Sequence, residues 1–186
     1  HTVMATVTDY ARDICAVCTA PSKTFNLAGV QCSNIILPEN KVDAVLAAVK
    51  KPYDMLNVFA YTACQAAYEQ CEDWLEELKE VIYDNKQTVK DYLSNELPVI
   101  KLVECEATYL LWLDCSALNV SSKVLSEFLR QNQGLFLSAG VDFGQNGDNF
   151  LRMNIACPQE LLILGLSRLK MGIIALNNIS QLSKNI

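Results

Sequence analysis

A long helical segment at residues 57–97 constrains the fold of this chain more than any other feature. Apolar residues recur through it at helical spacing, with Ala60 and Cys64 on one face, and charged residues back the apolar face over its second half. Pro98 ends the pattern, because proline lacks a backbone N–H and restricts the residue before it. A helix of this length commonly connects two domains, so we expect a domain boundary near residues 80–95.

Shorter elements lie on both sides of this helix. Before it, apolar runs at 14–18 and 34–38 predict buried strands, and a helix is expected between Pro38 and Pro52. After it, the pattern predicts strands at 99–104, 109–114, 135–137 and 150–156, a helix at 121–131 and a final helix from 158 onward that packs deeply. The sequence therefore predicts an α/β first third, a helical connector and a smaller α+β unit.

The charge pattern argues against two classes of partner. The formal net charge is -6, and the lysines and arginines are scattered rather than gathered into a basic stripe, which argues against a nucleic-acid surface. The apolar stretch at 161–176 is interrupted by Arg168 and Lys170, and we expect it to be too short to span a bilayer. No nucleic-acid or membrane partner is therefore expected.

The eight cysteines fall inside apolar runs and are interpreted as reduced, buried thiols of a cytosolic protein. Cys15 and Cys18 form a C-x-x-C pair, but their side chains point to opposite faces of a strand, and we expect no metal site. The lone histidine is His1, a poor place for an oriented catalytic base, so Ser–His and Cys–His hydrolases are disfavoured. No Walker or Rossmann phosphate loop is found.

Lys23 is the strongest catalytic candidate. It lies in a loop of small residues between the two predicted strands, with Pro21, Asn26 and Gly29 shaping the turn. A lysine held at the end of buried strands is partly desolvated, which makes its neutral amine more available for a Schiff base. The alternative is an ordinary solvated lysine, the commoner state of this residue type.

Four segments carry a family resemblance, in order and with matching spacing. They are Thr-Ala-Pro-Ser-Lys-Thr-Phe-Asn-Leu-Ala-Gly at 19–29, Ala-Ala-Tyr-Glu-Gln at 66–70 with Trp-Leu at 74–75, Thr-Tyr-Leu-Leu-Trp-Leu-Asp at 108–114, and Phe-Leu-Arg-Met-Asn-Ile-Ala-Cys-Pro at 150–158. Together they resemble the pyridoxal-phosphate enzymes of aminotransferase fold type I. The resemblance is closest to the MalY/PatB-type branch, which includes cystathionine β-lyases and related C–S lyases, and it covers nearly the whole chain.

The resemblance implies a fold and a domain organisation. Residues 1–85 would be the C-terminal part of the large α/β domain that binds pyridoxal phosphate, together with the interdomain helix. Residues 86–186 would be the small C-terminal α+β domain. The chain starts without methionine and family members are about twice as long, so it is expected to be the C-terminal half, with several cofactor-binding residues upstream of His1.

The resemblance also implies roles for three residues. Lys23 would form the resting Schiff base with pyridoxal phosphate and later remove the Cα proton of the substrate. Ser22 would contact the cofactor phosphate, although Ala20 stands where many members have a serine. Arg152 would bind the substrate α-carboxylate through paired hydrogen bonds. Its alternative role is that of a strand residue with a solvated head, and Trp112 is interpreted as a core residue.

The implied activity is C–S β-lyase chemistry, an α,β-elimination that converts sulfur amino acids to pyruvate, ammonia and a thiol. An aminotransferase is the first alternative, since both would use Lys23 and Arg152. A chain that holds no cofactor and catalyses nothing by itself is the second. The full-length protein is expected to be a cytoplasmic homodimer that acts on a small amino-acid substrate.

Overall fold

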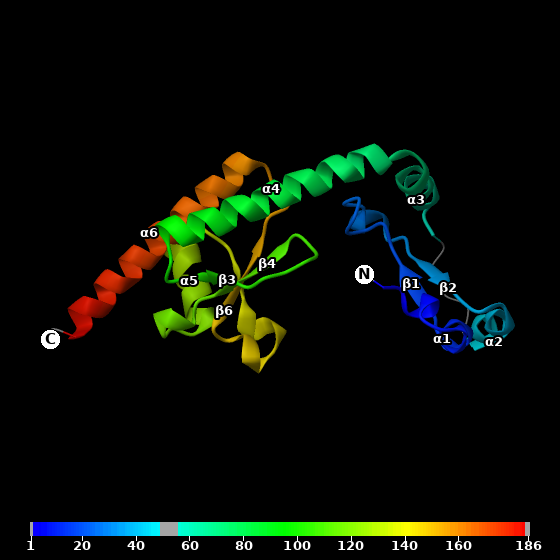
Figure 1. Cartoon of the computed structure of the whole chain (residues 1–186), viewed down its shortest axis with the longest axis horizontal. Helices are drawn as coiled ribbons and strands as arrows, with labels where there is room; N and C mark the ends of the chain where they lie inside the picture. The colour runs from blue at the N-terminus through cyan, green and yellow to red at the C-terminus, as the bar shows by residue number, and fades with distance from the viewer. Residues whose placement is uncertain (1, 49–55, 185–186) are drawn as a thin grey trace. The chain divides into compact units, whose positions relative to one another are not determined.

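The computed structural model describes residues 2–48 and 56–184, with side-chain burial given up to residue 179. The chain divides into two compact units, His1–Glu77 and Leu78–Ile186 (Figure 1). The helix α4 (Glu72–Glu96) begins in the first unit and continues into the second. The domain boundary that was predicted at residue 85 falls further along this same helix and stays a prediction.

The first unit combines a two-stranded antiparallel sheet with short helices. Its elements are α1 (Asp9–Ile14), β1 (Val17–Thr19), β2 (Asn34–Ile36), α2 (Val42–Ala48) and α3 (Val58–Gln70). β1 and β2 pair with Val17 opposite Ile36 and Thr19 opposite Asn34. The segment between the two strands therefore leaves and returns at one end of this hairpin, and it contains Lys23.

The predicted buried strand at 14–18 is wrong in two respects. Thr8 caps a helix there, with its Oγ1 accepting a hydrogen bond from Ala11 N (3.0 Å), so Ile14 belongs to α1. β1 is only three residues long, and its side chains are half-buried or exposed. The strand predicted at 34–38 is confirmed as β2, although two of its three residues are exposed. Pro52, expected to end the following helix, lies outside the described residues.

The long helical segment is confirmed, with one interruption. α3 begins after Asn57, whose Oδ1 accepts a hydrogen bond from Phe59 N (2.9 Å), and it ends at Gln70. Cys71 separates it from α4, which ends at Glu96 shortly before Pro98. The predicted stop is therefore confirmed to within two positions.

The second unit is built on a four-stranded antiparallel sheet in the order β3-β4-β6-β5. Its elements are β3 (Lys101–Leu102), β4 (Leu110–Asp114), α5 (Ser122–Gln133), β5 (Ser138–Ala139), β6 (Phe150–Asn154) and α6 (Gln159–Lys184). The strands predicted at 109–114 and 150–156 are confirmed as β4 and β6, and the helix predicted at 121–131 is confirmed as α5. The strand predicted at 99–104 is reduced to the two residues of β3.

The strand predicted near 135–137 begins later than expected, because the cap that ends α5 takes up Gly134 and Leu135. Gly134 adopts a left-handed conformation (φ 60°), and its N–H donates to Arg130 O (3.2 Å). Leu135 N–H donates to Leu129 O (3.2 Å), which completes a glycine-based helix cap. The chain enters the sheet only at Ser138, the first residue of β5.

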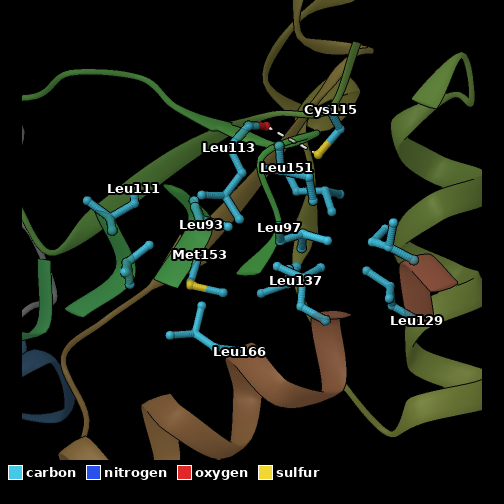
Figure 2. Close-up of a cluster of buried hydrophobic side chains, with 14 of the residues drawn as sticks. Leu93, Leu97, Leu111, Leu113, Cys115, Leu129, Leu137, Leu151, Met153 and Leu166 are labelled. Atoms are coloured by element: carbon cyan, nitrogen blue, oxygen red, sulfur yellow. Dashed lines mark hydrogen bonds between the residues drawn. The ribbon is translucent and has the colours of Figure 1, made fainter. Parts of the chain in front are cut away.

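One face of this sheet forms the hydrophobic core with three helices. In Figure 2, Leu111 and Leu113 of β4 lie beside Leu151 and Met153 of β6, with Leu166 of α6 next to them. The buried side chains that the helices contribute are Val89, Leu93, Leu125, Leu129, Leu162, Leu166, Leu169 and Ile173. Because side chains alternate along a strand, Trp112 and Arg152 lie on the opposite face of the sheet.

The final helix differs from its prediction in length and in burial. Gln159–Ile179 of α6 is long and apolar enough to cross a membrane by length and composition alone, so the expectation that this stretch was too short is wrong. Leu162, Leu166 and Leu169 of this helix are buried in the hydrophobic core. The expectation of deep packing holds for that face only, because Leu161 and Leu164 are exposed.

All eight cysteines are free thiols in the structure, yet their burial differs from the prediction. Cys32 and Cys115 are buried, whereas Cys18 is exposed and the other five are half-buried. Cys18 is exposed because β1 is a short strand with little packed around it. Burial raises the pKa of the Cys115 thiol to about 12 and also raises the pKa of Cys157.

Candidate active site

Lys23 lies in a tight turn directly after β1. Phe25 N–H donates to Pro21 O (2.9 Å), and Leu27 N–H donates to Ser22 O (3.0 Å), so two backbone hydrogen bonds enclose the lysine. Asn26 adopts φ 54°, a left-handed conformation that asparagine tolerates better than most residues. Asn26 therefore shapes the lysine turn, as expected from the sequence.

The side chains of this turn have unequal exposure. Lys23 is exposed, Ser22 is half-buried and Thr19 is exposed. The prediction of a partly desolvated lysine is therefore wrong for this chain, because β1 and β2 are themselves poorly covered. Among residues 2–48 and 56–184, no carboxylate lies within 4.0 Å of the Lys23 Nζ. The amine is thus accessible and is not held in an ion pair within the described part of the chain.

An aromatic cluster packs against the turn that carries Lys23. The Phe25 ring packs edge-on against Tyr68 of α3, with ring centroids 6.1 Å apart. It also stacks on Trp74 of α4, with centroids 6.0 Å apart and an interplanar angle of 27°. The lysine segment and the segment at 66–75, separated in sequence, are therefore in contact. This contact could not be predicted from the sequence, because ring packing between distant segments leaves no local pattern.

Arg152 is the central residue of β6 and is half-buried. It lies directly opposite Trp112 of β4 and Ser138 of β5 in the sheet register. Its Nη2 is 3.4 Å from Ser138 Oγ, and its guanidinium carbon lies 4.2 Å from the centroid of the Phe143 ring. In the described part of the chain, no carboxylate comes within 4.0 Å of this guanidinium.

Trp112 and Phe143 are the residues that sequence reasoning missed around Arg152. The interpretation of Trp112 as a core residue is wrong, because it lies on the sheet face opposite Leu111 and Leu113. Its ring meets Phe143 edge-on, with centroids 5.5 Å apart. Alternation along β4 could have indicated that Trp112 lies on the other face from Leu111 and Leu113. The sheet register then places Trp112 opposite Arg152. Phe143 lies in a short 3-10 helix (Gly140–Phe143) and carried no such signal.

Ser22 and Lys23 lie in one turn of the first unit. Arg152 lies in the second unit and forms a separate site. The side chains at these two sites have the chemical groups that a pyridoxal phosphate enzyme needs. Lys23 offers an accessible amine that can condense with an aldehyde, and Ser22 offers a hydroxyl that can donate to a phosphate. Arg152 offers in-plane N–H donors with no competing carboxylate among the described residues. The donor set therefore fits this cofactor and an amino-acid substrate.

Comparisons with known proteins agree with this chemistry. The cystathionine β-lyase PatB of Bacillus subtilis is 39% identical over 172 residues, which cover 91% of this chain and 44% of PatB. The protein MalY of Escherichia coli is 32% identical over 162 residues, covering 86% of this chain and 42% of MalY. The aspartate aminotransferase of Pyrococcus horikoshii is less similar, at 24% identity over 151 residues. No protein-family model matches the chain.

Solved structures with a similar fold belong to the same group of enzymes. The crystal structure of cystalysin from Treponema denticola, which contains a pyridoxal 5'-phosphate cofactor, matches 95% of this chain and 45% of cystalysin, with a TM-score of 0.84 and 34% identity. The chain thus spans less than half the length of the proteins it matches. The predicted fold class is confirmed. The chain belongs to the fold-type I pyridoxal-phosphate enzymes and corresponds to the C-terminal half of their PatB and MalY-type members.

Proposed function

We propose that the full-length protein is a pyridoxal-phosphate-dependent C–S β-lyase of the cystathionine β-lyase type. It would cleave sulfur amino acids to pyruvate, ammonia and a thiol. The observation that carries this proposal is the 39% identity to PatB over 91% of the chain, compared with 24% identity to an aspartate aminotransferase. The accessible amine of Lys23 supports it chemically, as does the Arg152 guanidinium, which has no carboxylate within 4.0 Å among the described residues.

Lys23 is the proposed site of cofactor attachment and of proton transfer. When bound, pyridoxal phosphate supplies an electron-accepting ring that stabilises negative charge at the substrate Cα. The Lys23 Nζ would act as the general base that takes the proton from the substrate Cα. The two backbone hydrogen bonds of the turn and the Phe25 anchor fix the Cα position of Lys23, which leaves only its side chain to move. Ser22 would donate its hydroxyl hydrogen to the cofactor phosphate.

Arg152 is the proposed clamp for the substrate α-carboxylate. A guanidinium and a carboxylate form two parallel hydrogen bonds, which fix both the position and the plane of the amino acid. The Arg152 side chain is half-buried on the sheet face opposite the hydrophobic core, and among the described residues its N–H groups make one long contact, to Ser138 Oγ (3.4 Å). A cation in that state gains from an anionic ligand, because partial burial strengthens the interaction.

The organisation of the whole protein follows from the same proposal. Residues 1–85 would complete the large cofactor-binding domain and its interdomain helix, and residues 86–186 would form the small domain. The full-length protein would act as a cytoplasmic homodimer on a small amino acid. Sedimentation of the full-length protein tests the dimer, and a monomer that retains full activity would contradict it.

The product distribution tests the activity. Purified full-length protein with pyridoxal phosphate is given L-cystathionine, and pyruvate, ammonia and free thiol are quantified. The proposal predicts the three products in equal amounts without any added keto acid. A new keto acid formed only when an amino-group acceptor is added would show an aminotransferase instead. Absence of both activities from a correctly folded full-length protein would contradict the proposal.

A further inference from the structure

The Arg152 guanidinium lies over the face of an aromatic ring. Its central carbon is 4.2 Å from the centroid of the Phe143 ring, well within the range in which a cation is attracted to the π-system. A cation–π contact engages the charge of the guanidinium and does not need its N–H groups as hydrogen-bond donors. Phe143 therefore restrains the arginine without consuming the donors that a carboxylate would need.

A second ring fixes Phe143 itself. Trp112 meets Phe143 at an interplanar angle of 85°, with centroids 5.5 Å apart, and it also meets Phe150 edge-on at 6.0 Å. Trp112 is in turn held by the sheet, where it lies directly opposite Arg152. The three side chains Trp112, Phe143 and Arg152 thus form one contact chain on a single face of the sheet.

The loop that carries Phe143 is anchored at both ends. A side chain at Gly140 would meet Gly147 O at 2.1 Å and Phe150 O at 2.6 Å, so the two ends of the loop pass in close backbone contact. Beyond the loop, Asp148 Oδ1 accepts hydrogen bonds from Ser122 N and Ser122 Oγ, both 3.1 Å long. Ser122 is fully buried at the start of α5. The backbone of the loop that carries Phe143 is therefore held by close packing at its ends and by a buried hydrogen-bond network beyond it.

From this geometry we propose that Phe143 is a positioning residue that presents the Arg152 guanidinium edge to the carboxylate of the amino-acid ligand. The inference rests on the proposed function, in which Arg152 binds that carboxylate. A free arginine side chain loses rotational freedom when it binds, and an arginine already stacked on a ring loses less. Removal of the ring should therefore weaken carboxylate binding while leaving proton transfer at Lys23 unchanged.

A matched pair of substitutions tests the role of the ring. Phe143→Leu removes the ring beside Arg152, whereas Phe136→Leu removes a similar contact in the same unit, where Arg130 lies 5.5 Å from the Phe136 ring centroid. Both phenylalanines are exposed, Phe143 at 50% and Phe136 at 67%, so both variants should fold. Phe143→Tyr keeps an aromatic ring and serves as the conservative variant.

Inhibition constants of L-alanine and L-alaninamide are measured for each full-length holoenzyme with L-cystathionine as substrate. We expect Phe143→Leu to weaken L-alanine about two- to fivefold, the range of a cation–π contact at an exposed site. L-Alaninamide, which lacks the carboxylate, should be unaffected. KM should rise by a similar factor at unchanged kcat, Phe143→Tyr should behave as the parent, and Phe136→Leu should show no change.

Direct observation of the arginine complements these constants. The Nε–H resonance of Arg152, assigned by its loss in Arg152→Lys, should shift when the Phe143 ring is removed and stay in place in Phe136→Leu. If Arg152→Lys weakens L-alanine but Phe143→Leu does not, the positioning role of Phe143 is wrong and the proposed function stands. If Arg152→Lys leaves the affinity for L-alanine unchanged, the carboxylate clamp is wrong and the inference fails with it.

Discussion

Phe25 and Trp74 stack with their ring centroids 6.0 Å apart, which joins the turn that carries Lys23 to the first turn of α4. Stacked aromatic pairs contribute about 0.5–1.5 kcal/mol beyond their burial. Because the backbone of the turn otherwise depends on two hydrogen bonds, this contact should control how often the turn opens.

A double-mutant cycle of Phe25→Leu and Trp74→Leu should give a coupling energy of about 0.5–1.5 kcal/mol. The measurement is native-state hydrogen exchange at the Leu27 amide, which donates across the lysine turn to Ser22 O. Tyr61→Leu, a change at an exposed residue of α3, is the control and should leave this exchange rate unchanged. Strictly additive effects of the two substitutions would show that the stack does not hold the turn.

Asn85 joins α4 to the end of β6. It is fully buried, and its Nδ2 donates to Ile155 O and Cys157 O, both at 2.9 Å. Asn85→Ala would remove both hydrogen bonds, one buried and one partly buried, and should lower the free energy of unfolding by about 1–3 kcal/mol. Denaturant unfolding followed by tryptophan fluorescence measures this change. Asn95→Ala, at an exposed position of the same helix, should change it by less than about 0.5 kcal/mol. Equal effects of the two substitutions would contradict the assigned role.

Two glycines of α6 should respond oppositely to alanine. A Cβ at Gly172 would lie 2.3 Å from Leu129 Cδ2, so Gly172→Ala should cost about 1–3 kcal/mol through overpacking. A Cβ at Gly165 would meet only Leu135 Cδ1, at 3.8 Å, so Gly165→Ala should gain about 0.5–1 kcal/mol from helix propensity. Thermal unfolding of both variants checks the signs. A stabilised Gly172→Ala variant would show that α5 and α6 do not pack as closely as described.

Cys115 should make stability depend on alkaline pH. Burial among apolar side chains, with the nearby Asp114 carboxylate as a smaller cause, raises the pKa of its thiol from 9.0 to about 12. The folded state thus holds the proton more tightly than the unfolded state. The raised pKa of Cys115 therefore contributes to the free energy of unfolding. This contribution is fully present below about pH 9 and is lost as the pH rises toward about 12, at up to roughly 1.4 kcal/mol per pH unit.

Unfolding free energies of the parent and of Cys115→Ala, compared at about pH 8 and pH 10.5, measure this contribution. The parent should lose more stability between the two values than the variant does. At about pH 8, iodoacetamide should modify the exposed Cys18 and leave Cys115 unmodified until the protein unfolds. Parallel pH profiles for the two proteins would rule out the raised pKa as a source of stability change.

The sequence predicted the elements that have a strong internal pattern. The long apolar face of α3 and α4 and the alternation of β4 and β6 were sufficient, because their residues repeat with the period of the element they form. It failed at 14–18 and placed the strand near 135–137 too early, and in both places a local cap decided the structure. Thr8 started a helix in the first case, and Gly134 ended one in the second. A hydrogen bond from one side chain, or a left-handed φ angle at one residue, does not change the apolar periodicity of the sequence.

The candidate site was predictable only in part for a related reason. Lys23, Ser22 and Arg152 stood out through the motifs that contain them, whereas their supporting residues did not. Phe25 and Phe143 acquire their roles from rings contributed by distant segments, Trp74 in one unit and Trp112 in the other. Exposure of Lys23 was also mispredicted, because an apolar run does not report how many strands cover it.

Reductive trapping shows directly whether Lys23 carries pyridoxal phosphate. The full-length protein is incubated with pyridoxal phosphate, reduced with borohydride and digested, and the peptides are identified by mass spectrometry. We expect one pyridoxyl group per chain, attached to the Nζ of Lys23 and absent from Lys23→Ala. Stoichiometric labelling at any other lysine, or a full-length protein that acquires no label, would contradict this role of Lys23.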